Sequence, residues 1–397
     1  MLLRLKHLSQ KRRRRNQLDM RPMKHIFLMC NRNHQQVQNV SPMDAPVPIN
    51  QGLQPPKGLI YVSDTDPGYR RQRAGKGFCY VKPDGTHVKA GPCLSRIKTL
   101  SIPPAWKDVW ICSNSSGHLQ ATGRDQEGRK QYIYHEEWTS YRDEQKFGNL
   151  THFAKSLPAL REQMKHDLRC QGLSRNRVLA SIVWLLDCTL MRIGNESYVK
   201  QNKSYGLTTL RSRHVKVEGD EMRFSYTGKS GKRWKLKLND RRMAKLILSV
   251  QQIPGQHLFQ YLQGTEKYEI RSQDVNEYIS SATGEDFTSK DFRTWGATVT
   301  TALSLEKTTL PDSTREKART LNAAIDTAAR LLCNTRTVCR RSYIHPAVIT
   351  AWQRGQLPPE MNAIRRNAGF AVKGLKEGEA LVLSWLSKHG TPSPSAR

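Results

Sequence analysis

The sequence predicts an α+β protein in which a small, β-rich N-terminal domain precedes a larger, mainly helical domain with a three-stranded β insertion. Three observations predict this fold: short apolar runs between turn residues at 58–140, helical spacing of apolar residues from about 150 onward, and three strand-like segments within 214–238. The chain of 397 residues is long enough for two or three domains.

The N-terminal part of the chain, residues 1–57, has the composition of a disordered tail. It contains five consecutive basic residues at 11–15 and then a stretch rich in Asn, Gln and Pro, with eleven basic residues against two acidic ones. Such a segment buries too little apolar surface to fold alone. We expect a basic disordered tail here, with a DNA-binding arm or a nuclear-type address as functional alternatives, and a second disordered segment at 389–397.

The strand-rich domain is expected over residues 58–140. Apolar runs at 59–62, 78–81 and 109–111 have the length and composition of strands, and the segment 130–135 closes a second hairpin. Pro, Asp and Gly residues between these runs favour tight turns.

The helical domain is expected over residues 150–388. Apolar residues recur at three- and four-residue spacing within 178–186 and 321–332, and Ser313 with Glu316 has the spacing of a capping box ahead of the second helix. The β insertion is predicted at 214–217, 222–227 and 233–238, with glycine in both turns.

The charge of the chain points to a polyanionic partner. The net charge is +31, of which +9 lies in the tail, which leaves +22 on the part expected to fold. A surface this basic attracts nucleic acid, and charge alone does not distinguish DNA from RNA. Because no run of about 18 apolar residues occurs, we expect no membrane-spanning helix.

The sequence carries no signature of a cofactor. The eight cysteines are scattered and form no CxxC pair, so neither a zinc site nor a disulfide framework is expected. A Walker A loop and a GxGxxG fingerprint are also absent. We therefore expect no metal, no cofactor and no nucleotide, and reduced cysteines in a cytoplasmic protein.

Basic residues in unusual local settings mark a candidate site. Arg192 follows the first predicted helix in LMRIGNE, Lys229 lies in a hairpin turn, and Arg293 lies in KDFRTWG. An arginine among apolar residues needs an anionic partner. The segment NTRTVCRRSYIHP at 334–346 adds Tyr343 to this set.

These segments resemble the type IB DNA topoisomerases, in particular the compact, poxvirus-like bacterial branch. The resemblance rests on Arg192 in MRIGNESY, Lys229 in YTGKSGKRW, Arg293 in KDFRTWG and Tyr343 in CRRSYIHP, in the order of the family, and on YGLTTLRSRHV. RIKTLSIPPAWKDVWIC and GHLQATGRDQEGRKQYIYH in the N-terminal domain are also similar to this branch. The similar segments span residues 58–388. They imply that the helical domain has the fold shared by tyrosine recombinases and type IB topoisomerases.

The resemblance implies relaxation of supercoiled duplex DNA through transient cleavage of one strand. Tyr343 would attack the phosphodiester and hold the 3′ end as a phosphotyrosine, which releases a 5′-hydroxyl. Arg192 and Arg293 would stabilise the charge that builds on the nonbridging oxygens, and Lys229 would protonate the leaving oxygen. Because the covalent bond stores the energy of the broken strand, religation would require neither ATP nor a metal.

Position 334 departs from the wider family. Many members have histidine nine residues before the nucleophile, whereas this chain has Asn334. An amide can donate a hydrogen bond to a nonbridging oxygen but supplies neither a proton nor a positive charge. We include Asn334 in the catalytic set and leave open whether it fully replaces the histidine. His345 is expected to be structural.

The resemblance also implies that both domains grip double-stranded DNA as a clamp. Alternation along 130–134 places Lys130, Tyr132 and Tyr134 on one strand face, where they can meet phosphates, sugars and base edges, and a solvated edge strand is the alternative. The predicted DNA-contacting residues are Gln120, Lys130, Tyr132, Tyr134, Asn195, Tyr198, Lys200 and Tyr205. We expect a monomer associated with the nucleoid.

Two other functions compete with this interpretation. A tyrosine recombinase shares the chemistry but usually has histidine three residues before the second arginine, where this chain has Lys290. A non-catalytic basic DNA-binding protein would account for the charge alone. A recombinase needs paired sites and a coating protein never attaches covalently to DNA, so relaxation of a single plasmid and covalent trapping separate the three functions.

Overall fold

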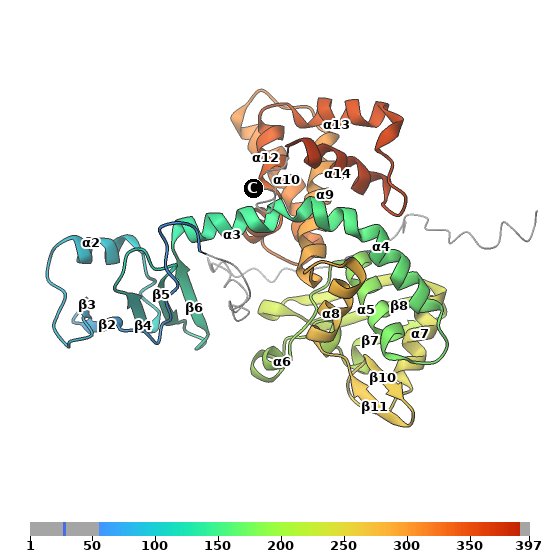
Figure 1. The fold of residues 1–397 in the computed structure, drawn as a ribbon, viewed down its shortest axis with the longest axis horizontal. Helices are drawn as coiled ribbons and strands as arrows, with labels where there is room; N and C mark the ends of the chain where they lie inside the picture. The colour runs from blue at the N-terminus through green and yellow to red at the C-terminus, as the bar shows by residue number, and fades with distance from the viewer. Residues whose placement is uncertain (1–26, 29–54, 390–397) are drawn as a thin grey trace, which may run out of the picture. The chain divides into compact units, whose positions relative to one another are not determined.

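The computed structural model describes residues 27–28 and 55–389 (Figure 1). These residues divide into two compact units. The first unit contains residues 27–28, 156–344 and 371–378, and the second contains 55–155, 345–370 and 379–389. An N-terminal β-sheet and a mainly helical C-terminal part give a mixed architecture, as predicted. The remaining residues of both predicted disordered ends lie outside the described residues, so their disorder stays a prediction.

The sheet of the second unit has five antiparallel strands in the order β3-β2-β4-β5-β6. One helix, α2 (Pro92–Thr99), packs its buried Ile97 against Val109, Ile111 and Ala121 of this sheet. The strands are β2 (Gly68–Ala74), β3 (Gly77–Val81), β4 (Lys107–Cys112), β5 (Leu119–Arg124) and β6 (Lys130–Tyr134).

The predicted strands 78–81, 109–111 and 130–135 correspond to β3, β4 and β6, but the run 59–62 is not a strand. Ile60 forms an isolated bridge to Gly117, and the Val62 N–H donates to His118 Nδ1 at 3.1 Å. These contacts hold residues 59–62 as a loop against the turn that precedes β5. The segment therefore lies outside the sheet although it is apolar.

Helices complete the second unit: α3 (Glu136–Gly148), the first residues of α4 (Leu150–Arg169), α12 (Pro346–Gln353), α13 (Leu357–Arg366) and most of α14 (Glu377–His389). Trp385 Nε1 of α14 donates to Glu360 Oε2 of α13 at 2.8 Å. The rings of Phe147 and His345 meet edge to face at 5.3 Å, which joins the end of α3 to the start of α12.

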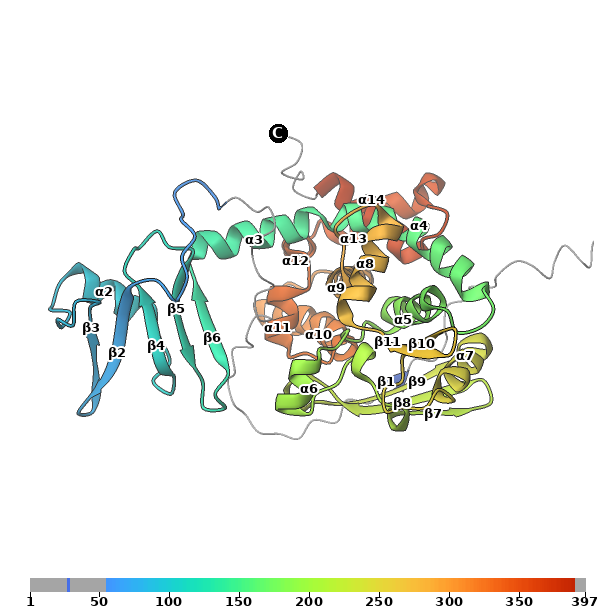
Figure 2. The same cartoon turned by 60° about the horizontal axis from the view of Figure 1, so that its bottom comes forward.

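The β insertion lies in the first unit, as predicted. The strands β7 (Val215–Glu218), β8 (Glu221–Thr227) and β9 (Arg233–Asn239) form an antiparallel sheet, and the short β1 (Phe27–Leu28) adds a fourth strand beside β9. Side chains of β8 and β9 alternate between buried and exposed positions, as expected for a sheet with one face in the core. Helix α7 (Arg241–Gln251) packs on β7 and β8 (Figure 2).

In the first unit, α5 (Arg175–Thr189) and α9 (Ser289–Glu306) are mostly buried, and α8 (Ser272–Thr283) contacts both of them. Ser313 caps α10 (Thr314–Leu332), because its Oγ accepts from the Glu316 N–H at 3.1 Å, which is one of the two hydrogen bonds of the predicted capping box. No helix in the described part of the chain is long and apolar enough to cross a membrane. The helices are α5 (Arg175–Thr189), α6 (Glu196–Asn202), α8 (Ser272–Thr283), α9 (Ser289–Glu306), α10 (Thr314–Leu332) and α11 (Arg336–Ser342), and β10 (Gln260–Gln263) with β11 (Glu266–Glu269) forms a separate hairpin.

A buried ion pair ties α4 to α5. Arg161 Nε and Nη2 donate to the two carboxylate oxygens of Asp187 at 2.9 and 2.8 Å, and the two side chains are only 2% and 10% exposed. Arg161 Nη1 also donates to the Gly374 carbonyl at 2.9 Å, which fastens the segment 371–378 to the same unit. Burial raises the pKa of Asp187, but the charges of Arg161 and Lys376 outweigh this effect and lower the pKa below its usual value.

We predict that Arg161→Met destabilises the protein by about 3–5 kcal/mol at neutral pH, because it leaves a carboxylate buried without its partner. Since the folded pKa of Asp187 is lowered, the pair stabilises the wild type above the unfolded pKa of about 3.9, and this contribution is lost as the pH falls through the folded value. Urea unfolding followed at several pH values measures both effects.

The matched control is Arg161→Met combined with Asp187→Leu, which removes both charges and should recover much of the lost stability. If the single variant unfolds at the wild-type urea concentration at neutral pH, the ion pair does not support the fold in the way described.

Candidate active site

All five predicted catalytic residues lie in the first unit, and most of them lie at helix ends. Arg192 follows the end of α5, Asn334 follows the end of α10, and Tyr343 is the residue at which α11 ends. Arg293 lies in the early part of α9, and Lys229 lies between β8 and β9.

Arg293 links the ends of two helices. It is 3% exposed, and its Nη1 and Nη2 donate to the carbonyls of Leu190 and Leu332, the second at 3.0 Å. These carbonyls end α5 and α10, where the helix dipole favours a cation. Arg293 Nε is buried and has no hydrogen-bond partner among the described residues.

Tyr343 lies against this arginine. The Arg293 Cζ is 5.1 Å from the centroid of the Tyr343 ring, within the range of a cation–π contact. The Tyr343 N–H donates to the Cys339 carbonyl at 3.0 Å, and the residue is half-buried. The structure therefore brings together the predicted nucleophile and one of the predicted arginines.

Arg192 and Asn334, which are far apart in the sequence, are in direct contact. Arg192 Nη2 donates to Asn334 Oδ1, and the Asn334 N–H donates to the Ala329 carbonyl at 2.9 Å. Because a guanidinium can only donate, the amide oxygen must face Arg192, so the amide nitrogen is left as a donor. Asn334 Nδ2 is buried without a partner in the described part of the chain, as expected for a group that awaits an acceptor.

Two glycines allow the loop after α5 to pair with the segment 205–209. The Leu207 N–H donates to the Arg192 carbonyl at 2.9 Å. A Cβ on Gly206 would lie 2.5 Å from the Gly194 nitrogen, and Gly194 itself has a φ of +105°, which favours glycine. The segment GLTT belongs to a motif that the sequence analysis identifies, but the sequence does not predict that this segment fixes the backbone of Arg192.

Lys229 lies in a short 3₁₀ turn (Lys229–Gly231) in which Ser230 adopts a left-handed conformation with φ of 61°. Its Nζ lies 5.9 Å from the centroid of the Tyr198 ring. The structure thus brings together one predicted catalytic residue and one predicted DNA-binding residue.

Tyr226 on β8 is a neighbour of the site that the sequence does not indicate. It is buried, and its ring stacks on Trp234 at a centroid distance of 5.9 Å. Burial raises the pKa of Tyr226, although the charges of Arg192 and Arg293 act in the opposite direction. Its hydroxyl therefore stays protonated beside the two arginines.

Two titratable residues close to Tyr343 in the sequence, Cys339 and His345, are fixed in their neutral forms. Burial raises the pKa of the Cys339 thiol to about 12, so the thiol does not compete as a nucleophile. Burial lowers the pKa of His345 to about 4, and its Nδ1 accepts from the Ala347 N–H at 3.1 Å at the start of α12. These contacts give His345 the structural role predicted for it. None of the described cysteines forms a disulfide.

The remaining predicted DNA-binding residues of the first unit surround α6. Asn195 caps this helix, because its Oδ1 accepts from the Ser197 N–H at 2.8 Å. Lys200 is exposed on the helix. The ring of Tyr205 packs edge to face on His214 at 4.5 Å. Asn195 and Tyr205 therefore have structural contacts as well as their predicted role.

The predicted face of β6 in the second unit forms a ladder. Lys130 Nζ lies 5.6 Å from the Tyr132 ring centroid, and the rings of Tyr132 and Tyr134 stack at 6.0 Å with an interplanar angle of 10°. This arrangement confirms that the three side chains share one face. Lys130 also pairs with Asp64 at 2.5 Å, so its ammonium has an acidic partner within the unit.

Gln120 is not placed as the DNA-binding prediction requires. It is 4% exposed, its Oε1 accepts from Arg96 Nη1 at 2.6 Å, and its Nε2 donates to the Ser115 and Gly117 carbonyls at 3.0 and 2.7 Å. Because the amide oxygen and nitrogen of Gln120 already have partners in the same unit, these hydrogen bonds would have to break before the side chain could contact DNA.

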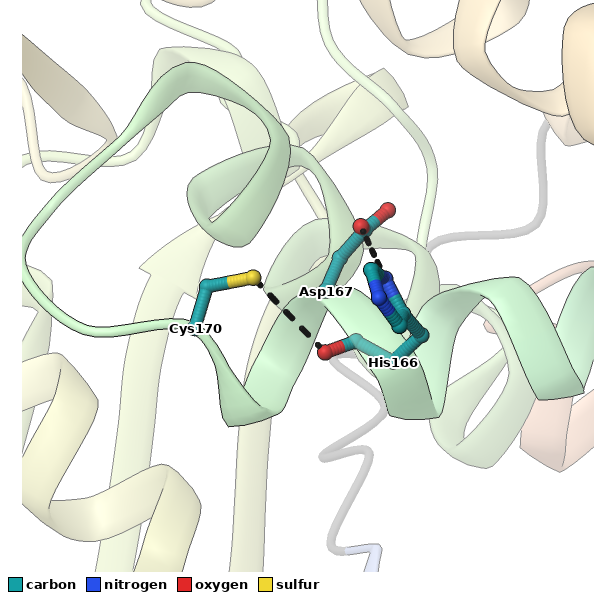
Figure 3. A group of neighbouring side chains, drawn as sticks. All are labelled: His166, Asp167 and Cys170. Atoms are coloured by element: carbon teal, nitrogen blue, oxygen red, sulfur yellow. Dashed lines mark hydrogen bonds and ion pairs between the residues drawn. The ribbon is translucent and has the colours of Figure 1, made fainter.

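His166, Asp167 and Cys170, at the end of α4, offer potential metal-ligand atoms within 4.8 Å of one another (Figure 3). Asp167 already accepts hydrogen bonds from Tyr278 Oη at 2.7 Å and from Gln163 Nε2 at 3.1 Å. Burial raises the pKa of Asp167, but these bonds and the one from His166 bring it below its usual value. The carboxylate thus has a structural role, because it ties α4 to α8.

Two known protein families match this chain, one in its N-terminal part and one in its mainly helical part. Residues 135–361 match the catalytic core of eukaryotic DNA topoisomerase I, and residues 77–125 match the N-terminal domain of bacterial DNA topoisomerase IB. The first match contains all five predicted catalytic residues, and the second lies in the five-stranded sheet and the segments around it.

Individual proteins show the same similarity. DNA topoisomerase 1B of Acanthamoeba polyphaga mimivirus is 33% identical over 294 residues, which cover 72% of this chain and 88% of the viral protein. DNA topoisomerase 1B of vaccinia virus is 22% identical over 47% of this chain and 64% of its own length, and DNA topoisomerase 1 of Mycosarcoma maydis is 24% identical over 56% and 25%. The chain therefore belongs to the type IB DNA topoisomerases, in the poxvirus-like and bacterial branch of the family.

Proposed function

We propose that Tyr343 is the nucleophile with which this topoisomerase cleaves one strand of duplex DNA. The phenol loses its proton as its oxygen bonds to the phosphorus, the bond from phosphorus to the 5′ oxygen breaks as that oxygen gains a proton, and the 3′ end stays on the protein as a phosphotyrosine. The reverse reaction restores the strand after the DNA has rotated. The observation that carries this proposal is the buried Arg293 guanidinium, 5.1 Å from the centre of the Tyr343 ring.

The proposed roles of Arg192, Arg293 and Asn334 follow from their donors. Each can donate hydrogen bonds to the nonbridging oxygens, where negative charge increases during the attack. Supporting evidence comes from the two buried atoms without described partners, Arg293 Nε and Asn334 Nδ2. Because Asn334 is neutral, it adds a hydrogen bond but no charge, and the positive charge comes from the two guanidinium groups.

Lys229 is the proposed general acid. The departing 5′ oxygen is a poor leaving group unless it receives a proton, and an ammonium can supply one and recover it in the reverse step. A position at the tip of the β8–β9 hairpin supports this role, because such a tip can move toward bound DNA.

DNA contacts are proposed for both units. The Lys130, Tyr132 and Tyr134 ladder on β6 and the residues Asn195, Tyr198, Lys200 and Tyr205 around α6 supply them. The net charge of +31 supports this proposal, since neutralisation of phosphates dominates the affinity of basic proteins for DNA.

The finer organisation follows the resemblance to the family. We propose a basic tail at 1–57, an N-terminal clamp domain at 58–140, a catalytic domain at 150–388 with the fold shared with tyrosine recombinases, and a short C-terminal tail at 389–397. The enzyme is proposed to act as a monomer, without ATP or a metal, in association with the nucleoid. The β7–β9 insertion within the helical part and Lys290 in place of histidine support the topoisomerase form of this fold.

Tyr343→Phe is predicted to bind duplex DNA with wild-type affinity and to lose plasmid relaxation entirely, because only the attacking oxygen is removed. Relaxation is measured on one supercoiled plasmid in EDTA without nucleotide, and binding is measured by fluorescence anisotropy. With the wild type, denaturant should trap protein on the 3′ end of a labelled strand. Trapping on the 5′ end, or full activity of the variant, would contradict the proposed chemistry.

Lys229→Ala should slow strand cleavage by roughly 10²–10⁴-fold, because the 5′ oxygen then leaves without a proton donor. A substrate with sulfur at the bridging 5′ position should restore the rate, since a thiolate departs without protonation. Single-turnover formation of the covalent adduct on the oxygen and sulfur substrates provides the measurement. Equal loss of rate on both substrates would exclude Lys229 as the acid.

Gly206→Ala should slow cleavage by roughly 10²-fold while duplex binding is retained, because displacing the Arg192 backbone misplaces the guanidinium. The backbone of Gly206 is extended, with φ of −144°, so alanine fits the conformation but clashes with the loop. The control is Gly77→Ala in β3, where the new Cβ would meet only the Ala74 carbonyl at 3.9 Å. Wild-type cleavage by Gly206→Ala would show that the loop pairing does not position Arg192.

A further inference from the structure

Helix α9 contacts Tyr343 at two places. Arg293 lies beside the ring of Tyr343, and Thr298, five residues further along the same helix, donates from its Oγ1 to the Tyr343 carbonyl at 3.2 Å. Thr298 is completely buried. A single rigid element therefore holds both the side chain and the main chain of the residue proposed to carry out the reaction.

The backbone of Tyr343 is where α11 ends. Its N–H still donates to the Cys339 carbonyl at 3.0 Å, but its φ of −135° is no longer helical. Carbonyls at a helix C-terminus have no N–H donor within the helix, so they accept hydrogen bonds from groups outside it. The Thr298 hydroxyl supplies such a donor and so fixes the direction in which the chain leaves the helix.

We propose that Thr298 is a positioning residue for the nucleophile, an inference that rests on the proposed role of Tyr343. In this role the hydroxyl acts on the main chain of Tyr343, to whose carbonyl it donates, and not on the reacting atoms. It holds the peptide group from which the Tyr343 ring projects, so the phenolic oxygen approaches the phosphorus in one direction with respect to Arg293. Because the same tyrosine oxygen is the nucleophile in cleavage and the leaving group in religation, Thr298 affects both directions alike.

This role needs the hydroxyl and not merely the volume of the side chain. Valine has nearly the shape of threonine and removes the donor, whereas serine retains the donor and loses a methyl group. Thr301 offers a matched control, because it lies on the same helix and is also completely buried. Its Oγ1 has no hydrogen-bond partner among the described residues, so Thr301→Val removes a hydroxyl without removing a described contact.

The experiment compares Thr298→Val, Thr298→Ser, Thr301→Val and the wild type in single-turnover cleavage and religation of a short duplex. DNA affinity and thermal melting are measured for each variant. We expect Thr298→Val to slow cleavage and religation by the same factor, roughly 10-fold, since displacement of a reacting group by a fraction of an ångström is costly. Its affinity for DNA should be unchanged. Thr298→Ser and Thr301→Val should remain within about twofold of the wild type.

Three results would overturn the inference: wild-type rates for Thr298→Val, equal slowing by Thr301→Val, or a Thr298→Ser variant as slow as Thr298→Val. The last result would assign the effect to packing. If Thr298→Val fails to fold, the serine variant still decides, because a slowed but stable Thr298→Ser is incompatible with a role for the hydroxyl alone. Tyr343→Phe is run in parallel: residual covalent attachment there would contradict the proposed nucleophile, whereas an inactive Tyr343→Phe with an unaffected Thr298→Val contradicts only the role of Thr298.

Discussion

A buried guanidinium carries donors that must find acceptors, and the way Arg293 finds them organises the surrounding structure. Two of its nitrogens bind the carbonyls of Leu190 and Leu332, and no carboxylate pairs with it among the described residues. Backbone carbonyls satisfy these donors without adding a net negative charge, because a peptide group is a dipole and not an ion. The charge therefore remains available to the Tyr343 ring and to an incoming anion.

The same interaction sets the course of the chain at the site. Leu190 and Cys333 both adopt left-handed conformations, with φ of 56° and 51°, and they end α5 and α10. At the end of each helix, the left-handed residue directs the chain toward a residue with a proposed catalytic role. This residue is Arg192 after α5 and Asn334 after α10. Gly296 leaves room for this arrangement, because a Cβ there would lie 2.5 Å from Leu190 Cδ1. The spacing of arginine and glycine in KDFRTWG thus has a steric reason as well as a chemical one.

The sequence predicts those features that depend on local patterns and misses those that depend on tertiary contacts. Alternation identifies β8 and β9 because only one of their faces is buried. It fails for β5, whose residues are buried on both faces, including the polar Gln120 and Thr122, which are satisfied by Arg96 and Asp64. The motifs locate the candidate catalytic residues through family resemblance, but they do not reveal contacts such as the one from Thr298 to Tyr343, 45 positions apart.

The fixed protonation states around the site restrict where protons can move. Burial keeps Tyr226 and Cys339, which lie near Arg293, in their neutral forms. In the reaction we propose, these two buried groups therefore contribute no charge that changes with pH. In the proposed reaction the proton transfers then fall to Tyr343, which is half-buried, and to Lys229 on its hairpin. A site of this kind separates charge stabilisation, supplied by rigid buried groups, from proton transfer, supplied by groups with access to solvent and to DNA.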